Sequence, residues 1–136
     1  MIKNLKINFK DKRGVILDIF TKNPKDHCTL VSFNKNAVRG NHYHKKSTQY
    51  SFILEGSLTM CTCKVNKSGK PIGKIKKKIV RKFDLIKHDA YVSHAFKSLN
   101  KSKILAFADG MRGGNSYEKD TYLSLIHISE PTRQAE

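Results

Sequence analysis

The sequence predicts an all-β domain, built either as a sandwich or as a closed barrel. Short runs rich in β-branched and aromatic residues recur along the chain, and clusters of Gly, Asn, Lys and Pro separate them. No window shows the sustained 3.6-residue periodicity of a capped amphipathic helix. The chain has 136 residues, which is enough for one domain with its own core and too few for two ordinary domains.

The expected strands in the first half of the chain are bounded by turn residues. The run at 15–20 is apolar and follows the turn sequence Lys-Arg-Gly. The run at 29–33 alternates and stops at Asn-Lys-Asn, and the run at 51–54 stops at Glu-Gly-Ser. Each of these runs has the length of a strand and is too short for a typical helix.

The second half of the chain continues the same pattern. Two runs, 58–65 and 75–80, flank a loop at 66–71 that contains Asn, Ser, Gly and Pro, which predicts a hairpin. The remaining expected strands are 83–87, 95–99 and 104–108, and a glycine-rich loop is expected at 110–115.

The chain is strongly basic, with 27 Lys and Arg against 11 Asp and Glu. Such an excess can attract nucleic acid or other anions. The basic residues are dispersed except in the segment 64–82, which has one aromatic residue nearby, Phe83. Single-stranded nucleic-acid sites usually interleave aromatic and basic residues. We therefore expect a solvated hairpin here and no nucleic-acid partner.

The cysteines and the N-terminus indicate a cytoplasmic protein without a membrane segment. No apolar run reaches the length that crosses a bilayer, and the charged N-terminus has no apolar signal-peptide core. The three cysteines, Cys28, Cys61 and Cys63, form an odd and sparse set that does not suit a disulfide framework. Cys61 and Cys63 would share one face of a strand. We expect them to be small buried residues, with a paired-thiol metal site as the alternative.

Three histidines form a candidate site. His42 and His44 stand two residues apart, so on a strand both imidazoles point to one face. Gln49 follows closely, and His94 comes from a distant expected strand. Imidazole suits zinc, iron, copper and nickel. We expect His42, His44 and His94 in one pocket with Gln49 as a further candidate ligand, whereas His88 lies in a polar segment and is expected to be solvated.

The spacing of these residues resembles that of a known family. The pattern His-x-His-x4-Gln-x6-Gly, followed by a later histidine, is similar to the two motifs of the cupin superfamily. Gln49 stands where the first motif usually has a glutamate, and Asp89 and Tyr91 stand where the second motif usually has proline and glycine. The resemblance implies a single cupin domain, a double-stranded β-helix or jelly-roll barrel.

A narrower resemblance points to sugar metabolism. The segment 39–45, Arg-Gly-Asn-His-Tyr-His-Lys, resembles a segment of cupin sugar 3,4-ketoisomerases, of capsular polysaccharide cupins and, in its Arg-Gly-x-His core, of nucleotide-sugar 3,5-epimerases. The segment 9–14 resembles the Phe-x-Asp-x-Arg-Gly opening of the same families. This implies an isomerase or epimerase that acts on a nucleotide-linked keto-deoxysugar in surface polysaccharide biosynthesis. The alternative is a non-catalytic or differently catalytic cupin that binds a metal or small ligand.

Such a reaction moves a proton beside a carbonyl, which requires a base with a suitable pKa and a group that stabilises the enediolate. His42 and His44 are the catalytic candidates. They could act without a metal, or with zinc, iron, manganese or nickel held by His42, His44, Gln49 and His94. We expect a nucleotide-sugar or other small-molecule ligand and a homodimer.

Arg39 and Lys45 are the candidates for substrate binding. Arg39 could hold a diphosphate or an enolate oxygen by paired hydrogen bonds. Strict alternation would place Arg39 on the face opposite His42, unless Gly40 supplies a β-bulge that redirects it. Lys45 meets the same difficulty, and Tyr43 is expected to pack on the outer face.

The last residues are expected to be foreign to the domain. The string Leu-Ser-Leu-Ile-His-Ile-Ser-Glu-Pro-Thr-Arg, which begins at Leu123, resembles a translated sequencing-library adapter. We therefore expect a cupin domain at 1–122 and a non-native tail at 123–136 that adds nothing to the fold. His127 is excluded from the site on the same ground.

Overall fold

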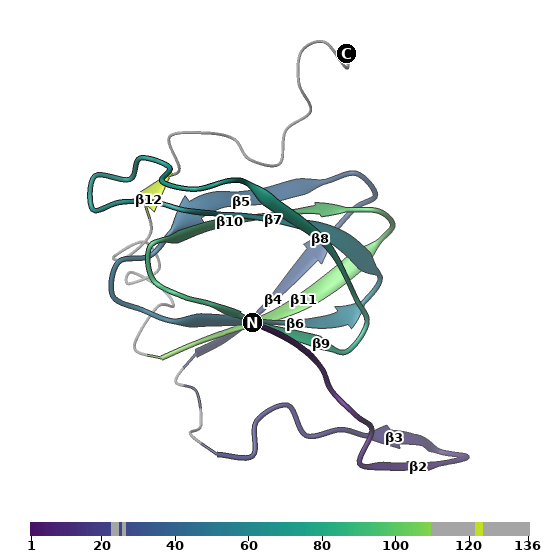
Figure 1. The fold of residues 1–136 in the computed structure, drawn as a ribbon. Coiled ribbons are helices and arrows are strands. Elements are labelled where there is room, and N and C mark those ends of the chain that lie inside the picture. Colours follow the sequence, from purple (N-terminus) through teal and green to yellow (C-terminus); the bar gives the residue numbers. More distant parts are fainter. Residues whose placement is uncertain (23–24, 26, 110–121, 124–136) are drawn as a thin grey trace.

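The computed structural model describes residues 1–22, 25, 27–109 and 122–123, and every regular element in this part of the chain is a strand (Figure 1). This confirms the predicted all-β class. No helix in the described ranges has the length and hydropathy that a membrane span requires. The expected glycine-rich loop at 110–115 lies outside the described residues.

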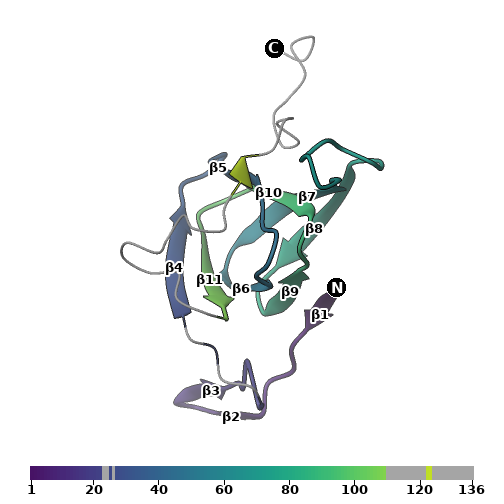
Figure 2. The ribbon, with the colours of Figure 1, turned by 90° about the vertical axis from the view of Figure 1, so that its left-hand side faces the viewer.

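Two antiparallel five-stranded sheets face each other and enclose the core (Figures 1 and 2). The first has the order β1-β9-β6-β11-β4, with β1 at Ile2–Asn4, β9 at Asp84–His88, β6 at Gln49–Glu55, β11 at Ser102–Ala108 and β4 at His27–Phe33. The second has the order β12-β5-β10-β7-β8, with β12 at Tyr122–Leu123, β5 at Val38–Tyr43, β10 at Val92–Ser98, β7 at Ser57–Lys64 and β8 at Lys76–Arg81. From β4 to β7 the chain crosses between the sheets at each step, as in a jelly roll.

A separate hairpin, β2 at Phe9–Asp11 and β3 at Gly14–Ile16, lies away from the two sheets in both views (Figures 1 and 2). The strand expected at 15–20 is therefore shorter than predicted. After β3 the chain packs Phe20 edge-to-face on Tyr50 and Phe107, with ring centroids 5.2 and 4.9 Å apart. The first residues of the apolar run at 15–20 thus belong to strand β3, and its last residue packs against aromatic rings.

The hydrophobic core is contributed by both sheets. β4, β6, β9 and β11 face β7, β8 and β10 across it, and its buried members are Phe33, Ile53, Leu58, Met60, Val80, Ile86, Phe96 and Ile104. A second buried group consists of Cys61, Cys63 and Ala95. The expectation that Cys61 and Cys63 are buried small residues on one face is thereby confirmed, and both thiols are free.

The pairing of β5 with β10 contains a β-bulge at the position where Gly40 was expected to permit one. His94 pairs with His42, and the next residue, Ala95, pairs with Gly40, so that Asn41 is the extra residue. Gly40 has a φ of 109° and Asn41 a φ of 60°, both in the left-handed region. Phe96 then pairs with Arg39. Because His94 and Phe96 share one face of β10, the bulge brings Arg39 to the same face as His42.

The short strands were not predicted. β1, β2 and β12 have three or fewer residues each, which is too few to show a periodicity. β12 pairs Tyr122 with Tyr43 and Leu123 with His42, so the boundary expected after Tyr122 falls inside a paired strand, although Leu123 itself is exposed. The rest of the expected tail, 124–136, lies outside the described residues, and its irrelevance to the fold stays a prediction.

Replacing Gly40 with alanine is expected to destabilise the protein. A Cβ atom at this position would lie 2.7 Å from the His94 carbonyl oxygen and 2.8 Å from Ala95 Cα. The backbone conformation also disfavours any side chain, so we expect a loss of about 2–3 kcal/mol in the free energy of unfolding. Urea denaturation measures it, with Gly73→Ala as the control, because a Cβ atom there meets nothing within 4 Å. If the two variants had the same free energy of unfolding, the bulge at Gly40 would be ruled out.

Candidate functional site

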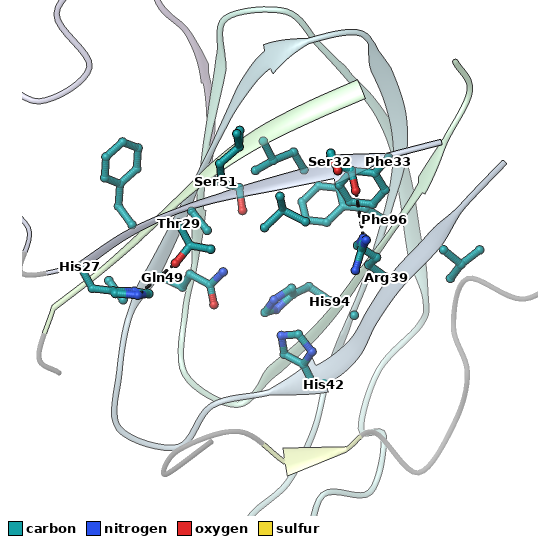
Figure 3. A pocket seen from close by; sticks show the side chains of 18 of the residues that line it. His27, Thr29, Ser32, Phe33, Arg39, His42, Gln49, Ser51, His94 and Phe96 are labelled. Carbon is teal, nitrogen blue, oxygen red and sulfur yellow. Dashed lines mark hydrogen bonds between the residues drawn. The ribbon is translucent and has the colours of Figure 1, made fainter. Parts of the chain in front are cut away.

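A cavity of about 650 Å³ lies between the sheets, within the range of small-molecule sites. Strands β4, β5, β6, β10 and β11 supply its walls, and Leu123 of β12 adds one further side chain. Figure 3 shows His42 and His94 together on one wall, Gln49 and Ser51 across from them, and Arg39 at one end. Residues from both motifs that the sequence analysis singled out therefore meet in one cavity.

His42, His44 and His94 form a compact cluster. One ring nitrogen from each lies within 4.8 Å of the others. The ring centroids of His42 and His94 are 4.6 Å apart, and those of His42 and His44 are 5.2 Å apart. The direct pairing of His42 with His94 across β5 and β10 produces this proximity. The expected convergence of the three histidines is thus present in the fold.

The two motif histidines differ in their surroundings. His42 is half-buried and lines the cavity. His44 follows the end of β5, is 1% exposed and does not line the cavity. Its Nε2 donates a hydrogen bond of 2.9 Å to Oε1 of Gln49. Gln49, expected as a metal ligand, is therefore engaged by an imidazole at the cavity wall.

His88 is buried, which corrects the expectation of a solvated loop residue. It ends β9 with 2% exposure and stacks on His94, with centroids 4.1 Å apart and an angle of 21° between the rings. Its Nε2 lies 2.8 Å from Ser51 Oγ. The inward residues of β9 alternate as Asp84, Ile86 and His88, so extending the predicted strand at 83–87 by one residue would have revealed the burial of His88.

Burial keeps the inner imidazoles neutral. Desolvation, and then the neighbouring His44 and His42, lower the pKa of His88 to about 3. Desolvation, with His88 as the next cause, holds the pKa of His94 well below its ordinary value. Around neutral pH these rings are uncharged, so each retains one nitrogen lone pair that can accept a proton or bind a metal.

Arg39 reaches the cavity, and Lys45 does not. Arg39 Nε donates a hydrogen bond of 3.1 Å to the carbonyl oxygen of Ser32 on β4, and its guanidinium lies 5.6 Å from the centroid of Phe33. The Lys45 ammonium lies 4.3 Å from the centroid of Tyr122, away from the cavity lining. Tyr43 stacks on Tyr122, in agreement with its expected outward direction.

The cluster has the composition of a metal site. His94 Nδ1 is buried and has no hydrogen-bond partner among the described residues, and a bound ion is one way to satisfy such an atom. On a tetrahedral zinc with Zn–N bonds of ~2.0–2.1 Å, the ligating nitrogens of two imidazoles lie about 3.3 Å apart. The three histidine nitrogens lie within 4.8 Å of one another, so they would have to move slightly closer together to share one ion. His42, His44 and His94 could hold zinc, iron or nickel, which imidazole suits better than manganese.

Comparison with known proteins matches the chain to solved structures, whereas no family model and no curated protein sequence matches it. The sugar 3,4-ketoisomerase QdtA from Thermoanaerobacterium thermosaccharolyticum aligns with a TM-score of 0.73 and 18% identity over 92% of this chain and 88% of its own. The dTDP-4-dehydrorhamnose 3,5-epimerase from Sulfolobus tokodaii aligns with a TM-score of 0.72 and 21% identity over 93% of this chain and 78% of its own. The chain has the RmlC-like cupin fold.

The same cupin fold occurs within a larger protein. The capsular polysaccharide assembling protein CapF from Staphylococcus aureus aligns with a TM-score of 0.64 and 17% identity over 90% of this chain. The chain spans about a third of CapF, since the match covers 33% of that protein. The predicted jelly-roll cupin is therefore confirmed at the level of the fold.

Acidification is expected to destabilise the metal-free protein. The unfolded chain binds protons on His88 and His94 below about pH 6.5, whereas the folded chain resists them because the pKa of each ring is lowered. The contribution of the two neutral histidines to the free energy of unfolding is therefore fully present above about pH 6.5. Below that pH it decreases as the pH is lowered, by up to about 1.4 kcal/mol per pH unit for each histidine. Urea denaturation of chelator-treated protein from pH 7.5 to 5 measures the slope. His88→Gln should flatten it, and a wild-type stability independent of pH would contradict the buried neutral rings.

Zinc is expected to bind to the cluster with a stoichiometry near one. Calorimetric titration of chelator-treated protein measures the affinity. Replacing His94 with alanine removes one of three donors and should weaken binding more than about 100-fold, since loss of a supporting residue alone costs 10–100-fold. His27→Ala is the control, because His27 lines the cavity outside the cluster and is hydrogen-bonded to Thr29. If both substitutions weakened zinc binding equally, the cluster of His42, His44 and His94 would not be the zinc site.

Proposed function

We propose that the chain is an isomerase or epimerase that acts on a nucleotide-linked keto-deoxysugar in surface polysaccharide biosynthesis, with His42 as the general base. One observation carries the proposal: His42 and Arg39 face the same cavity, which is large enough for a nucleotide sugar. A base beside a guanidinium is the arrangement that proton transfer on an anionic substrate needs.

His42 suits the role of base better than His44. It lines the cavity, whereas His44 lies behind the wall with a ring nitrogen engaged by Gln49. A general base must come within hydrogen-bonding distance of the proton that it removes. We assign His44 to the support of this wall, and the choice that the sequence left open falls on His42.

Arg39 would bind the anionic part of the substrate. Its Nε is held by the Ser32 carbonyl, which fixes the guanidinium at the end of the cavity. A guanidinium can pair with two phosphate oxygens through parallel hydrogen bonds. The sugar would then extend from Arg39 toward His42 and His94.

The similar structures support the substrate class. QdtA was crystallised in complex with TDP, and the RmlC epimerase from Legionella pneumophila in complex with dTDP-4-keto-L-rhamnose. The latter aligns with a TM-score of 0.71 and 14% identity over 90% of this chain and 70% of its own. At this level of sequence identity the reaction of this chain stays a proposal, and the residues that line the cavity support it.

A metal- or ligand-binding cupin without this activity is the second candidate. The histidine cluster and the unpartnered Nδ1 of His94 favour it. A metal held by His42, His44 and His94 would keep a coordination position open for a small ligand. Both candidates use the same cavity but exclude each other at His42, because an imidazole that binds a metal has no lone pair left to accept a proton.

We also propose a homodimer, in which the β2–β3 hairpin takes part. Phe9 and Ile16 pair directly across this hairpin and are exposed in the single chain, so their side chains lie together on one face. Clustered apolar side chains at the surface mark interaction sites when they form a contiguous patch.

Replacing His42 with asparagine is expected to lower proton exchange about 10²–10⁴-fold, the usual contribution of a general base. Asparagine keeps a similar size and some hydrogen bonding. Exchange of deuterium from D₂O into TDP-4-keto-6-deoxyglucose, followed by NMR, is the measurement. His44→Asn should cause a smaller loss, because His44 does not line the cavity. If wild-type protein exchanges no proton in this or related keto-sugar nucleotides, the enzyme proposal fails and the ligand-binding cupin takes its place.

A further inference from the structure

The cavity wall across from His42 contains a serine–histidine pair that the proposed proton transfer does not use. Ser51 Oγ and His88 Nε2 are 2.8 Å apart, and both side chains are buried. Ser51 lines the cavity, and Figure 3 shows its hydroxyl directed toward the interior. His88 does not line the cavity. A ligand in the cavity can therefore contact Ser51 but not His88, to which Ser51 is hydrogen-bonded.

The surrounding contacts fix the imidazole of His88. The ring stacks on His94 at 4.1 Å and meets the ring of Phe96 edge-on at 5.7 Å. On the backbone, His88 pairs with Gln49, and Ser51 pairs with Ile86 in the same ladder. These aromatic contacts fix the plane of the His88 ring, and the hydrogen bond to Ser51 selects the orientation in which Nε2 faces the hydroxyl.

Either group can donate in the Ser51–His88 hydrogen bond, and the tautomer of His88 decides which one does. A neutral imidazole has one nitrogen with a lone pair, and a serine hydroxyl has one proton and two lone pairs. If the hydroxyl donates to Nε2, the proton of Ser51 is committed to His88 and both oxygen lone pairs remain. Ser51 is already directed toward the cavity, so it offers a ligand an acceptor. A hydroxyl that donates in this way is also polarised and accepts more strongly.

We propose that Ser51 is a specificity residue that accepts a hydrogen bond from a sugar hydroxyl group of the ligand, and that His88 is the positioning residue that fixes Ser51 as an acceptor. The inference rests on the proposed function and specifies what that site selects. A ligand with a keto or deoxy carbon opposite Ser51 would leave a buried acceptor without a partner, and sites that hydrogen-bond a substrate hydroxyl reject such analogues strongly.

The first test compares the binding of TDP-glucose with that of TDP by calorimetry on chelator-treated protein. TDP-glucose has no carbonyl beside the sugar carbons, so binding is separated from turnover. Ser51→Ala should lower the affinity for TDP-glucose about tenfold, the upper range for a neutral hydrogen bond, and leave the affinity for TDP unchanged. Ser68→Ala is the control, because Ser68 is exposed and lies outside the cavity lining.

The second test separates positioning from folding. His88→Gln keeps an amide oxygen that can accept the Ser51 proton, and His88→Phe does not. The ratio of the two affinities should stay at the wild-type value in His88→Gln and fall about tenfold in His88→Phe. Partial unfolding would lower both affinities alike and leave the ratio unchanged. In wild-type protein, ¹⁵N NMR of the His88 ring should show Nε2 without a proton.

The outcomes distinguish this inference from the proposed function. If wild-type protein exchanges protons on the keto-sugar but Ser51→Ala leaves the affinity ratio unchanged, the role of Ser51 is overturned and the proposed function stands. A protonated Nε2 on His88 overturns the acceptor role directly. If wild-type protein neither binds TDP-glucose nor exchanges a proton, the proposed function fails and this inference fails with it.

Discussion

The β-bulge between β5 and β10 is the constraint on which the site depends. Without the extra residue at Asn41, Arg39 and His42 would point to opposite faces of β5, and the cavity would contain one of them. Gly40 permits the bulge because its backbone conformation and its approach to His94 leave no room for a side chain. The left-handed conformation of Asn41 is tolerated because β10, the strand opposite the bulge, is held on its other edge by β7.

The histidines are placed by strand pairing next to the bulge. His42 pairs directly with His94, and His94 in turn stacks on His88 inside the barrel. Each ring therefore reduces the access of water to the next. Burial then keeps the inner rings neutral. Strand pairing thus fixes the position of the imidazoles, and their burial fixes their protonation.

The sequence predicted the all-β class and the pairing of His42 with His44 from short-range patterns, whereas His94 joined the cluster through the resemblance to the second cupin motif. Alternation with period 2 identified most strands, and the spacing of His42 and His44 set their common side. Arg39 could be placed once Gly40 suggested a bulge. The positions that the sequence missed depend on pairing between distant strands. The burial of His88 follows from the pairing of β9 with β6, which a polar histidine between Lys87 and Asp89 does not reveal.

The role of Ser51 was hidden for the same reason, since its partner belongs to another strand. In the sequence Ser51 is one small residue in an apolar run, and no motif includes it. The short strands β1, β2 and β12 carry no periodic signal. Local patterns therefore specify which faces are buried, whereas the partners within the buried layer emerge only from the topology of the sheet.

The electrostatics of the cavity follow from these placements. Among the described residues that line it, Arg39 has the only permanent charge and none is a carboxylate. The remaining polar groups are imidazoles, hydroxyls and one amide, and the net charge of the whole chain is +16. Such a cavity attracts an anion, and it offers an imidazole where a carboxylate base would oppose a negatively charged substrate. A divalent metal on the cluster would increase this preference, since no acidic side chain in the described lining would offset its charge. Charge and geometry therefore favour the same ligand, an anionic group at Arg39 with an uncharged, hydroxyl-bearing part between His42 and Ser51.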